Sequence, residues 1–114
     1  MLIAAREAQG HYVWTVNQPA AKEAGLSDET IAAIREYRAP AGFESRDATV
    51  VQFVLELLRQ HRISDTTFEA MRELVGNAGV VDLLVVTGYY HTLVHSLQAL
   101  EVELPEGAVP EIPD

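Results

Sequence analysis

The longest apolar segment of the chain runs from residue 79 to residue 100, with the sequence GVVDLLVVTGYYHTLVHSLQAL. Six of its first eight residues are valine or leucine, so this half has almost no polar side. The second half has apolar residues three and four positions apart, the spacing of an amphipathic helix, at Tyr90, Leu93, Val94, Leu97 and Leu100. Such a helix is buried on most sides. The pattern predicts an all-α domain organised around a long buried C-terminal helix, covered by the other helices and by a second subunit.

Two other interpretations of this segment are weaker. The run VVDLLVV is rich in β-branched residues and is compatible with a strand, but the helical spacing that continues after it favours a helix. A length of about 22 residues would suffice to cross a bilayer. Asp82, His91, His95 and Gln98, together with the acidic segment that follows, argue against a membrane span.

The rest of the chain predicts shorter helices separated by turn residues. Helical spacing of apolar residues, bounded by Ser, Asp, Gly and Pro, places one helix within 11–26 and the others at 1–9, 28–37, 47–61 and 66–75. Gly10 is expected to end the first helix. Ser27 is expected to cap the third, and Ser64 or Asp65 the fifth. Glycines 76 and 79 are expected to bracket a tight turn into the central helix.

Pro19 leaves two interpretations of residues 11–26. Proline is tolerated in the first turn of a helix but costs ~3 kcal/mol in its interior. Asn17 could therefore cap a helix from Gln18 to Ala24, or a single helix could begin near Tyr12 and kink at Pro19. In both interpretations the glycine that follows ends the helix.

The apolar pattern is already running at Leu2 and Ile3, with no capping residue before them. A helix that starts so abruptly suggests that the chain once began further upstream. In that case we expect a neighbouring subunit to cover these two residues.

The 114 residues predict one domain. We place a single helical domain at 1–104 and an acidic, proline-rich tail at 105–114, which we expect to be extended or partly disordered. Residues 38–46, RAPAGFESR, combine proline and glycine and predict a loop within the domain.

Charge and cysteine content exclude several classes of function. The net charge is −9, from seventeen acidic and eight basic residues, which argues against nucleic acid and anionic membrane surfaces as partners. The absence of cysteine excludes a disulfide framework, a thiolate metal site and a thiol redox cycle. The N-terminus has no signal-peptide pattern, and we expect a cytoplasmic protein.

Four blocks of the chain, in the same order, resemble the carboxymuconolactone decarboxylase family. The first is an aromatic-x-Trp motif followed by a polar residue, an alanine-rich helix and Gly-Leu-Ser, here Tyr12, Val13, Trp14, Asn17, Ala20, Ala21, Ala24, Gly25, Leu26 and Ser27. The others are ETIAAI, FVLELLRQHRISDTTFEAMRELVG and VDLLVVTGYYHTLVHSLQALEVELPEG. The match covers almost the whole chain. It implies the all-α fold shared with the alkylhydroperoxidase D proteins, and assembly as a trimer or hexamer.

The resemblance also indicates what this chain lacks. In the thiol-peroxidase branch, a Cys-x-x-Cys pair, a histidine and an upstream glutamate form a proton relay. The first three positions correspond here to Gly10, Val13 and Asn17, and the glutamate would precede Met1. In the decarboxylase-like branch, a glutamate often stands at the place of Val13 and a histidine at that of Asn17. Thiol peroxidase activity is excluded, because a thiolate is its obligatory nucleophile.

His11 and Asn17 are the catalytic candidates that remain. Lactone decarboxylation, which in this family uses neither metal nor organic cofactor, needs a proton donor and acceptor and groups that bind the substrate carboxylate. His11 could transfer the proton, or be an exposed histidine in a turn. Asn17 could hold a substrate carbonyl or carboxylate, or be a helix cap. Tyr12 and Trp14 could line the substrate pocket, or belong to the core or an interface.

His91 and His95 lie four residues apart on one helix face. This spacing permits a shared metal ion, but no third ligand is evident and the family is not metal-dependent. The pair could instead line the substrate pocket or a subunit contact, or be satisfied in the core. Four arginines could bind a substrate anion, or be solvated or paired with acids: Arg6, Arg35, Arg38 and Arg46.

Two functional hypotheses follow. The first is a carboxymuconolactone decarboxylase-like carboxy-lyase of aromatic catabolism, acting on a small carboxylated lactone or organic acid by acid–base chemistry. The second is a family member without the catalytic relay that serves as an oligomeric ligand-binding or interaction protein. His11, Asn17 and an arginine converging on one cavity would favour the first, whereas a closed apolar pocket would exclude it.

Overall fold

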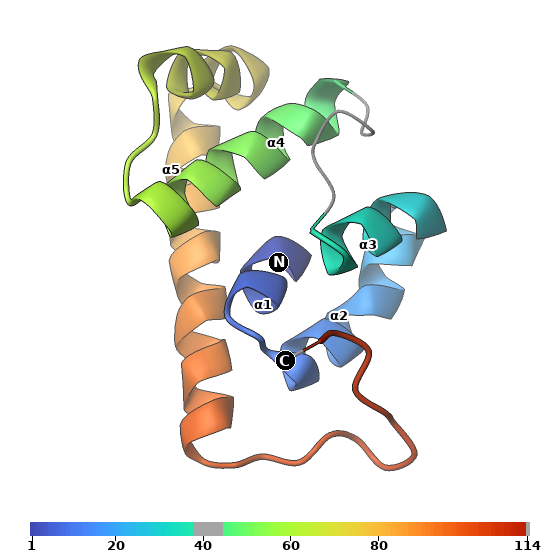
Figure 1. The fold of residues 1–114 in the computed structure, drawn as a ribbon. Coiled ribbons are helices and arrows are strands. Elements are labelled where there is room, and N and C mark those ends of the chain that lie inside the picture. Colours follow the sequence, from blue (N-terminus) through green and yellow to red (C-terminus); the bar gives the residue numbers. More distant parts are fainter. Residues whose placement is uncertain (38–44, 114) are drawn as a thin grey trace.

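The computed structural model describes residues 1–37 and 45–113. In chain order its elements are α1 (Leu2–Glu7), α2 (His11–Glu23), α3 (Asp28–Arg35), α4 (Ser45–Leu55), the π-helical segment η2 (Glu56–Gln60) and α5 (Asp65–Ala99). The described ranges contain no β-strand, so the predicted all-α class is confirmed. Figure 1 shows the short α1 surrounded by the other helices, with α5 along one side of the molecule. The loop predicted at 38–46 falls mostly outside the described residues.

A first core cluster joins the N-terminal helices to the C-terminal half of α5. Its buried members are Leu2, Ala5, Val13, Trp14, Ala21, Ile31, Val94 and Ile112. Ile31 of α3 is 1% exposed. The predicted cap of α3 is confirmed, because the Ser27 hydroxyl accepts a hydrogen bond from the Thr30 amide at 3.1 Å.

A second core cluster joins α4 to α5. Its buried members are Phe53, Val54, Met71 and Val80. Phe53 is fully buried, and its ring lies 6.5 Å from that of Phe68 between centroids. The helix predicted at 47–61 is observed as α4 followed by the π-helical η2.

Glu56, the first residue of η2, is a buried carboxylate that ties α4 to the start of α5. It accepts hydrogen bonds from Gln52 Nε2 and the Ser64 amide, both at 2.8 Å, and from Thr67 Oγ1 at 2.5 Å. These bonds, the one from Thr67 above all, lower the pKa of Glu56 to about 2. Ser64 also caps α5, because its hydroxyl accepts a hydrogen bond from the Thr67 amide at 3.3 Å. Of the two predicted caps, Ser64 and Asp65, the structure therefore has Ser64.

α5 consists of two helical pieces that meet at Gly76. This residue has φ 75° and ψ 172°, a conformation essentially restricted to glycine. The turn predicted between the two glycines is thus a break at Gly76 alone, and the chain is helical again at Asn77. Figure 1 shows the first piece set at an angle to the long second piece.

The second piece of α5 is buried along one face only. Val80, Thr87 and Val94 face the rest of the chain, whereas large apolar side chains on the opposite face are 57, 65 and 61% exposed, at Val81, Val85 and Tyr89. The prediction that this helix is buried on most sides is wrong for the single chain. The physical reason is that the other helices flank it from one side (Figure 1).

α2 is a single helix that passes through Pro19, as the second interpretation of residues 11–26 required. Asn17 lies inside it, and its side-chain amide donates to the Val13 carbonyl at 2.9 Å. The interpretation of Asn17 as a cap is therefore wrong. Pro19 has no N–H, so the Thr15 carbonyl has no intrahelical donor four residues on. Gly25, with φ 104°, turns the chain after the helix.

Both ends of the described chain pack within the fold. Leu2 is buried in the first core cluster and Ile3 packs against the second, so the expected cover by a neighbouring subunit is supplied instead by this chain. Residues 105–113 contain no helix or strand, only a turn at 106–107 and a bend at 112. This tail is nevertheless anchored, because Ile112 is 4% exposed within the first core cluster. Figure 1 shows this segment crossing from the end of α5 back toward the start of α2.

Candidate functional site

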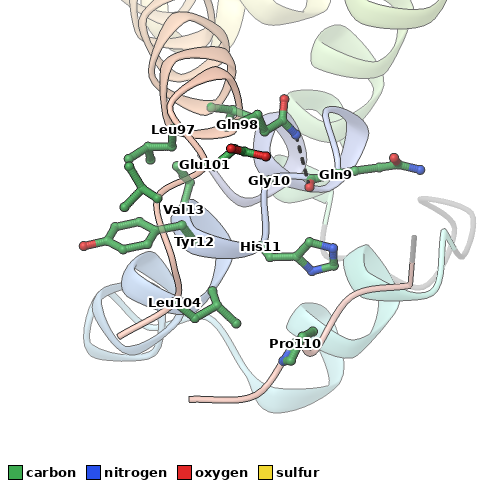
Figure 2. Close-up of a pocket in the computed structure, with 12 residues that line it drawn as sticks. Gln9, Gly10, His11, Tyr12, Val13, Leu97, Gln98, Glu101, Leu104 and Pro110 are labelled. Atoms are coloured by element: carbon green, nitrogen blue, oxygen red, sulfur yellow. Dashed lines mark hydrogen bonds between the residues drawn. The ribbon is translucent and has the colours of Figure 1, made fainter. Parts of the chain in front are cut away.

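A cavity of about 270 Å³ lies where the start of α2 meets the end of α5. Three segments line it: the link between α1 and α2 with the first turn of α2, the last turns of α5, and the tail (Figure 2). The lining residues are Gln9, Gly10, His11, Tyr12, Val13, Val94, Leu97, Gln98, Glu101, Val102, Leu104 and Pro110. Most of the lining surface is apolar, which is typical of sites for small organic molecules.

The link between α1 and α2 gives the cavity its shape. Gln9 has φ 55° and turns the chain there, so α1 is ended by Gln9 and not by the expected Gly10. Gly10 is required for a different reason: a Cβ at this position would lie 2.7 Å from Val94 Cγ2 of α5. Gln98 fixes the link from the α5 side, since its amide donates to the carbonyls of Ala8 at 2.8 Å and Gln9 at 3.3 Å. The cavity is therefore built around a close contact of two helices.

Two of the predicted site residues, His11 and Tyr12, line the cavity. Successive residues of an α-helix are rotated by about 100°, and Figure 2 shows the His11 imidazole and the Tyr12 ring pointing to opposite sides. Glu101, which was not predicted as a site residue, contributes a carboxylate to the lining. It reaches the cavity because it adopts φ 53° in the turn that follows α5. No motif in the sequence indicates that turn.

Asn17 and Trp14 do not line this cavity. The Asn17 amide is engaged with the carbonyl of Val13 on its own helix, so the structure does not bring it together with His11. Trp14 is fully buried in the first core cluster, and its indole N–H donates to Glu111 Oε2 at 3.3 Å. For Trp14 the core interpretation is therefore the one that the structure supports.

His91 and His95 also lie outside this cavity. Their rings pack edge to face, with centroids 5.5 Å apart. Burial and, secondarily, the neighbouring His95 lower the pKa of His91, while Glu7 opposes this shift. Within the described ranges, no group of three or more His, Cys, Asp or Glu side chains is arranged to hold a metal ion.

Three of the candidate arginines, Arg6, Arg35 and Arg46, do not line this cavity either. Arg6 is buried and acts as a structural donor, from Nε to the Arg35 carbonyl at 2.7 Å and from Nη1 to Tyr37 Oη at 2.8 Å. Its guanidinium also lies over the Tyr37 ring, 3.6 Å from the centroid. Arg46 is exposed, and Arg38 lies outside the described residues.

Comparison of the chain with models of protein families, with curated proteins and with solved structures gave no match. The resemblance to the carboxymuconolactone decarboxylase family therefore rests on the sequence blocks alone. Among the described helices, none combines the length and the apolar character that crossing a membrane requires.

The arrangement of the cavity favours holding a molecule over transferring protons to it. Aliphatic side chains from α2, α5 and the tail can enclose an apolar body, and the polar groups at Gln9, His11, Gln98 and Glu101 can bind one polar end. Acid–base catalysis would require a donor and an acceptor directed at the same reacting atoms. The divergence of His11 and Tyr12 does not supply such a pair.

Proposed function

We propose that this protein binds a small, mainly apolar organic acid or lactone in the cavity between α2 and α5, as a homo-oligomer in the cytoplasm. The observation that carries the proposal is a mostly apolar cavity in which the two predicted site residues, His11 and Tyr12, point to opposite sides. At the relay positions implied by the family resemblance, Val13 and Asn17 offer no titratable group. The proposal is thus the second hypothesis, a family-like protein without the catalytic relay.

Ligand binding is tested by calorimetry with paraconic acid, a carboxylated γ-lactone. Val102 lines the cavity and is partly exposed, so Val102→Trp places an indole in the cavity without disturbing either core cluster. We expect this substitution to weaken binding about tenfold or more, because it fills the space for the ligand.

The matched control is Val109→Trp, the same substitution at a tail residue that does not line the cavity. It should bind like the unmodified protein. Equal affinity in the two variants would place the ligand elsewhere, and no binding by the unmodified protein would refute the proposal.

The acid–base lyase is a second candidate, favoured by His11 and Glu101 lining the same cavity. One side chain could accept a proton while the other donates one. We expect no CO₂ release from carboxylated lactones above the uncatalysed rate. Release that is abolished by His11→Gln and by Glu101→Gln, with binding retained, would favour the lyase.

The homo-oligomer rests on the exposed face of α5. Ala78, Val81, Val85 and Tyr89 are exposed and follow one another at intervals of three and four residues, so they form one stripe along the helix. Beside them, a Cβ at Gly88 would meet nothing within 4 Å. We name this stripe with Gly88 the α5 face. Asp82 is also exposed and lies four residues after Ala78 and three before Val85, so it places a charge at the border of this face.

The exposed area of the chain also supports self-association. The chain exposes 7042 Å², whereas a compact monomer of 12.5 kDa is expected to expose about 6,200 Å². The chain thus exposes roughly 800 Å² more than a compact monomer of its mass. The family resemblance implies that the assembly is a trimer or hexamer.

Val85→Glu is expected to dissociate the oligomer, because it introduces a charge into the centre of the α5 face, where a partner would bury it. Light scattering after size exclusion should give a multiple of 12.5 kDa for the unmodified protein and the monomer mass for the variant. Val16→Glu is the matched control, since Val16 is an exposed valine on α2, and it should leave the assembly intact. An unmodified protein that is monomeric at micromolar concentration would contradict the proposal.

A further inference from the structure

The tail places a carboxylate and a branched apolar side chain against Trp14, the only tryptophan of the chain. Glu111 Oε2 accepts a hydrogen bond from Trp14 Nε1 at 3.3 Å and lies 3.7 Å from Arg35 Nη2. The next residue, Ile112, is buried in the first core cluster, to which Trp14 also belongs. Two consecutive residues of the tail thus present a carboxylate and an aliphatic side chain together. A small carboxylic acid with an apolar body would present the same two groups.

We propose that Trp14 and Arg35 form a binding site for a carboxylic acid with a branched apolar body, and that Glu111 and Ile112 occupy this site as an intramolecular ligand. The inference rests on the proposed function, because Pro110 of the same tail is a wall of the α2–α5 cavity. When the tail leaves, the Trp14 indole N–H and the Arg35 guanidinium lose their contacts with Glu111 and can bind another carboxylate.

The chemistry of the two donors fits a carboxylate. The Trp14 indole is a neutral donor held rigidly in the core, and the Arg35 guanidinium lies over its ring, 5.8 Å from the centroid. Arg35 Nε is buried and has no hydrogen-bond partner among the described residues. A carboxylate that takes both Nε and Nη2 would form the bidentate pair that arginine favours.

Glu111 satisfies this site only in part, which leaves room for a competing ligand. Its distance of 3.7 Å from Nη2 is longer than a hydrogen bond, so the tail forms an ion pair with Arg35 without using its directional donors. A free acid, which is not tethered to the backbone at Pro110, can approach Arg35 more closely. To displace the tail, the free acid must bind tightly enough to compete with the effective concentration at which the tail presents the Glu111 carboxylate.

Apart from buried Ile112 and the contacts of Glu111, few interactions with the other described residues hold the tail. Residues 105–113 contain no helix or strand, and Val109, between the cavity wall and the ion pair, is 69% exposed. One backbone hydrogen bond, from the Ala108 amide to the Pro105 carbonyl at 2.9 Å, shapes the turn. A segment with so few buried contacts belongs to the part of a protein that opens at low cost.

The experiment uses the full chain and the fluorescence of Trp14. Ile112→Asp removes the apolar anchor, and we expect the emission to shift to longer wavelength and acrylamide quenching to increase, because the indole becomes accessible to solvent. Val109→Asp is the matched control, with the same new charge at an exposed position of the same tail, and should keep the unmodified spectrum. An unchanged Trp14 in a folded Ile112→Asp variant would overturn the proposal, since the tail would then not cover the indole.

The ligand arm uses isocaproate, with isocaproamide as its neutral analogue. In Ile112→Asp we expect isocaproate to reverse the spectral shift saturably, and to bind about tenfold more tightly than the amide because of the charge-assisted bonds to Arg35. The affinity of the unmodified protein for isocaproate should be lower, since Ile112 competes. Equal binding of acid and amide, or no binding of either, would overturn the proposal.

Two further variants keep the test decisive. If circular dichroism shows that Ile112→Asp does not fold, Glu111→Gln replaces it, because this variant keeps the Ile112 anchor and removes the competing charge. Isocaproate must bind Glu111→Gln more tightly than it binds the unmodified protein. Equal or weaker binding would refute the proposal. Arg35→Gln in the Ile112→Asp background must abolish the preference for the acid. Paraconic acid could bind in a manner that depends on Val102 while isocaproate leaves the Trp14 fluorescence unchanged. This result would support the proposed function and refute only the site at Trp14 and Arg35.

Discussion

Replacement of Glu56 by alanine is expected to lower the free energy of unfolding by about 3 kcal/mol or more. The carboxylate accepts from Gln52, Ser64 and Thr67 while it is 4% exposed, so alanine would leave the amide at the start of α5 without its buried acceptor. The substitution also removes the link between α4 and α5. Equilibrium denaturation in urea measures the loss, and Gln52→Ala, which removes one exposed donor, should cost much less.

The pH dependence of stability gives an independent check on Glu56. Its pKa is about 2 in the folded chain, below its ordinary value of 4.5. Because the folded-state pKa is the lower one, the stability that Glu56 contributes is present above pH 4.5 and is lost as the pH falls toward 2. Glu56→Gln should be less stable at neutral pH and should show a shallower decline through that window. A parallel decline in both proteins would contradict this account.

Gly10→Ala is expected to destabilise the chain by about 1–3 kcal/mol, the usual cost of overpacking. The new Cβ would lie 2.7 and 2.8 Å from the two methyl carbons of Val94, whose side chain is buried. The effect is steric and not conformational, since Gly10 has φ −84°, which any residue can adopt. The start of α2 and the end of α5 would have to move apart.

A double-mutant cycle isolates this contact. Val94→Ala alone leaves a small cavity and also destabilises, but in its presence the methyl group of Gly10→Ala finds space. The double variant should therefore be more stable than the sum of the single losses predicts, by about 1 kcal/mol or more. Additive losses would mean that the two residues are not in repulsive contact. Because both line the cavity, the cycle also tests the geometry on which ligand binding depends.

Local chemistry made most helix boundaries predictable. Ser27 and Ser64 act as caps because a side-chain oxygen placed before an amphipathic pattern satisfies a free amide. Gly76 breaks α5 because its backbone conformation excludes other residues. The path through Pro19 was left open by the sequence, because packing of α2 decides whether one lost hydrogen bond is tolerated.

Non-local contacts set the limit of prediction. Ile112 is surrounded by acidic and proline residues, a composition typical of loose tails, yet it is buried by residues from the other end of the chain. The same applies to the site. His11 and Tyr12 were predicted from the family-like motif, whereas Glu101 reaches the cavity through the path of the backbone after α5. For the α5 face, composition indicates burial but does not identify what covers it.

The two core clusters are connected along α5 and also through the short α1, and the second connection has a consequence for cooperativity. Adjacent residues of α1 belong to different clusters, Leu2 to the first and Ile3 to the second, and α1 contacts α2, α3, α4 and α5. A six-residue helix has negligible stability by itself, so it is folded only while both clusters hold it. Loss of either cluster releases α1 and thereby exposes part of the other. The two halves of the chain should consequently melt together, as a single thermodynamic unit.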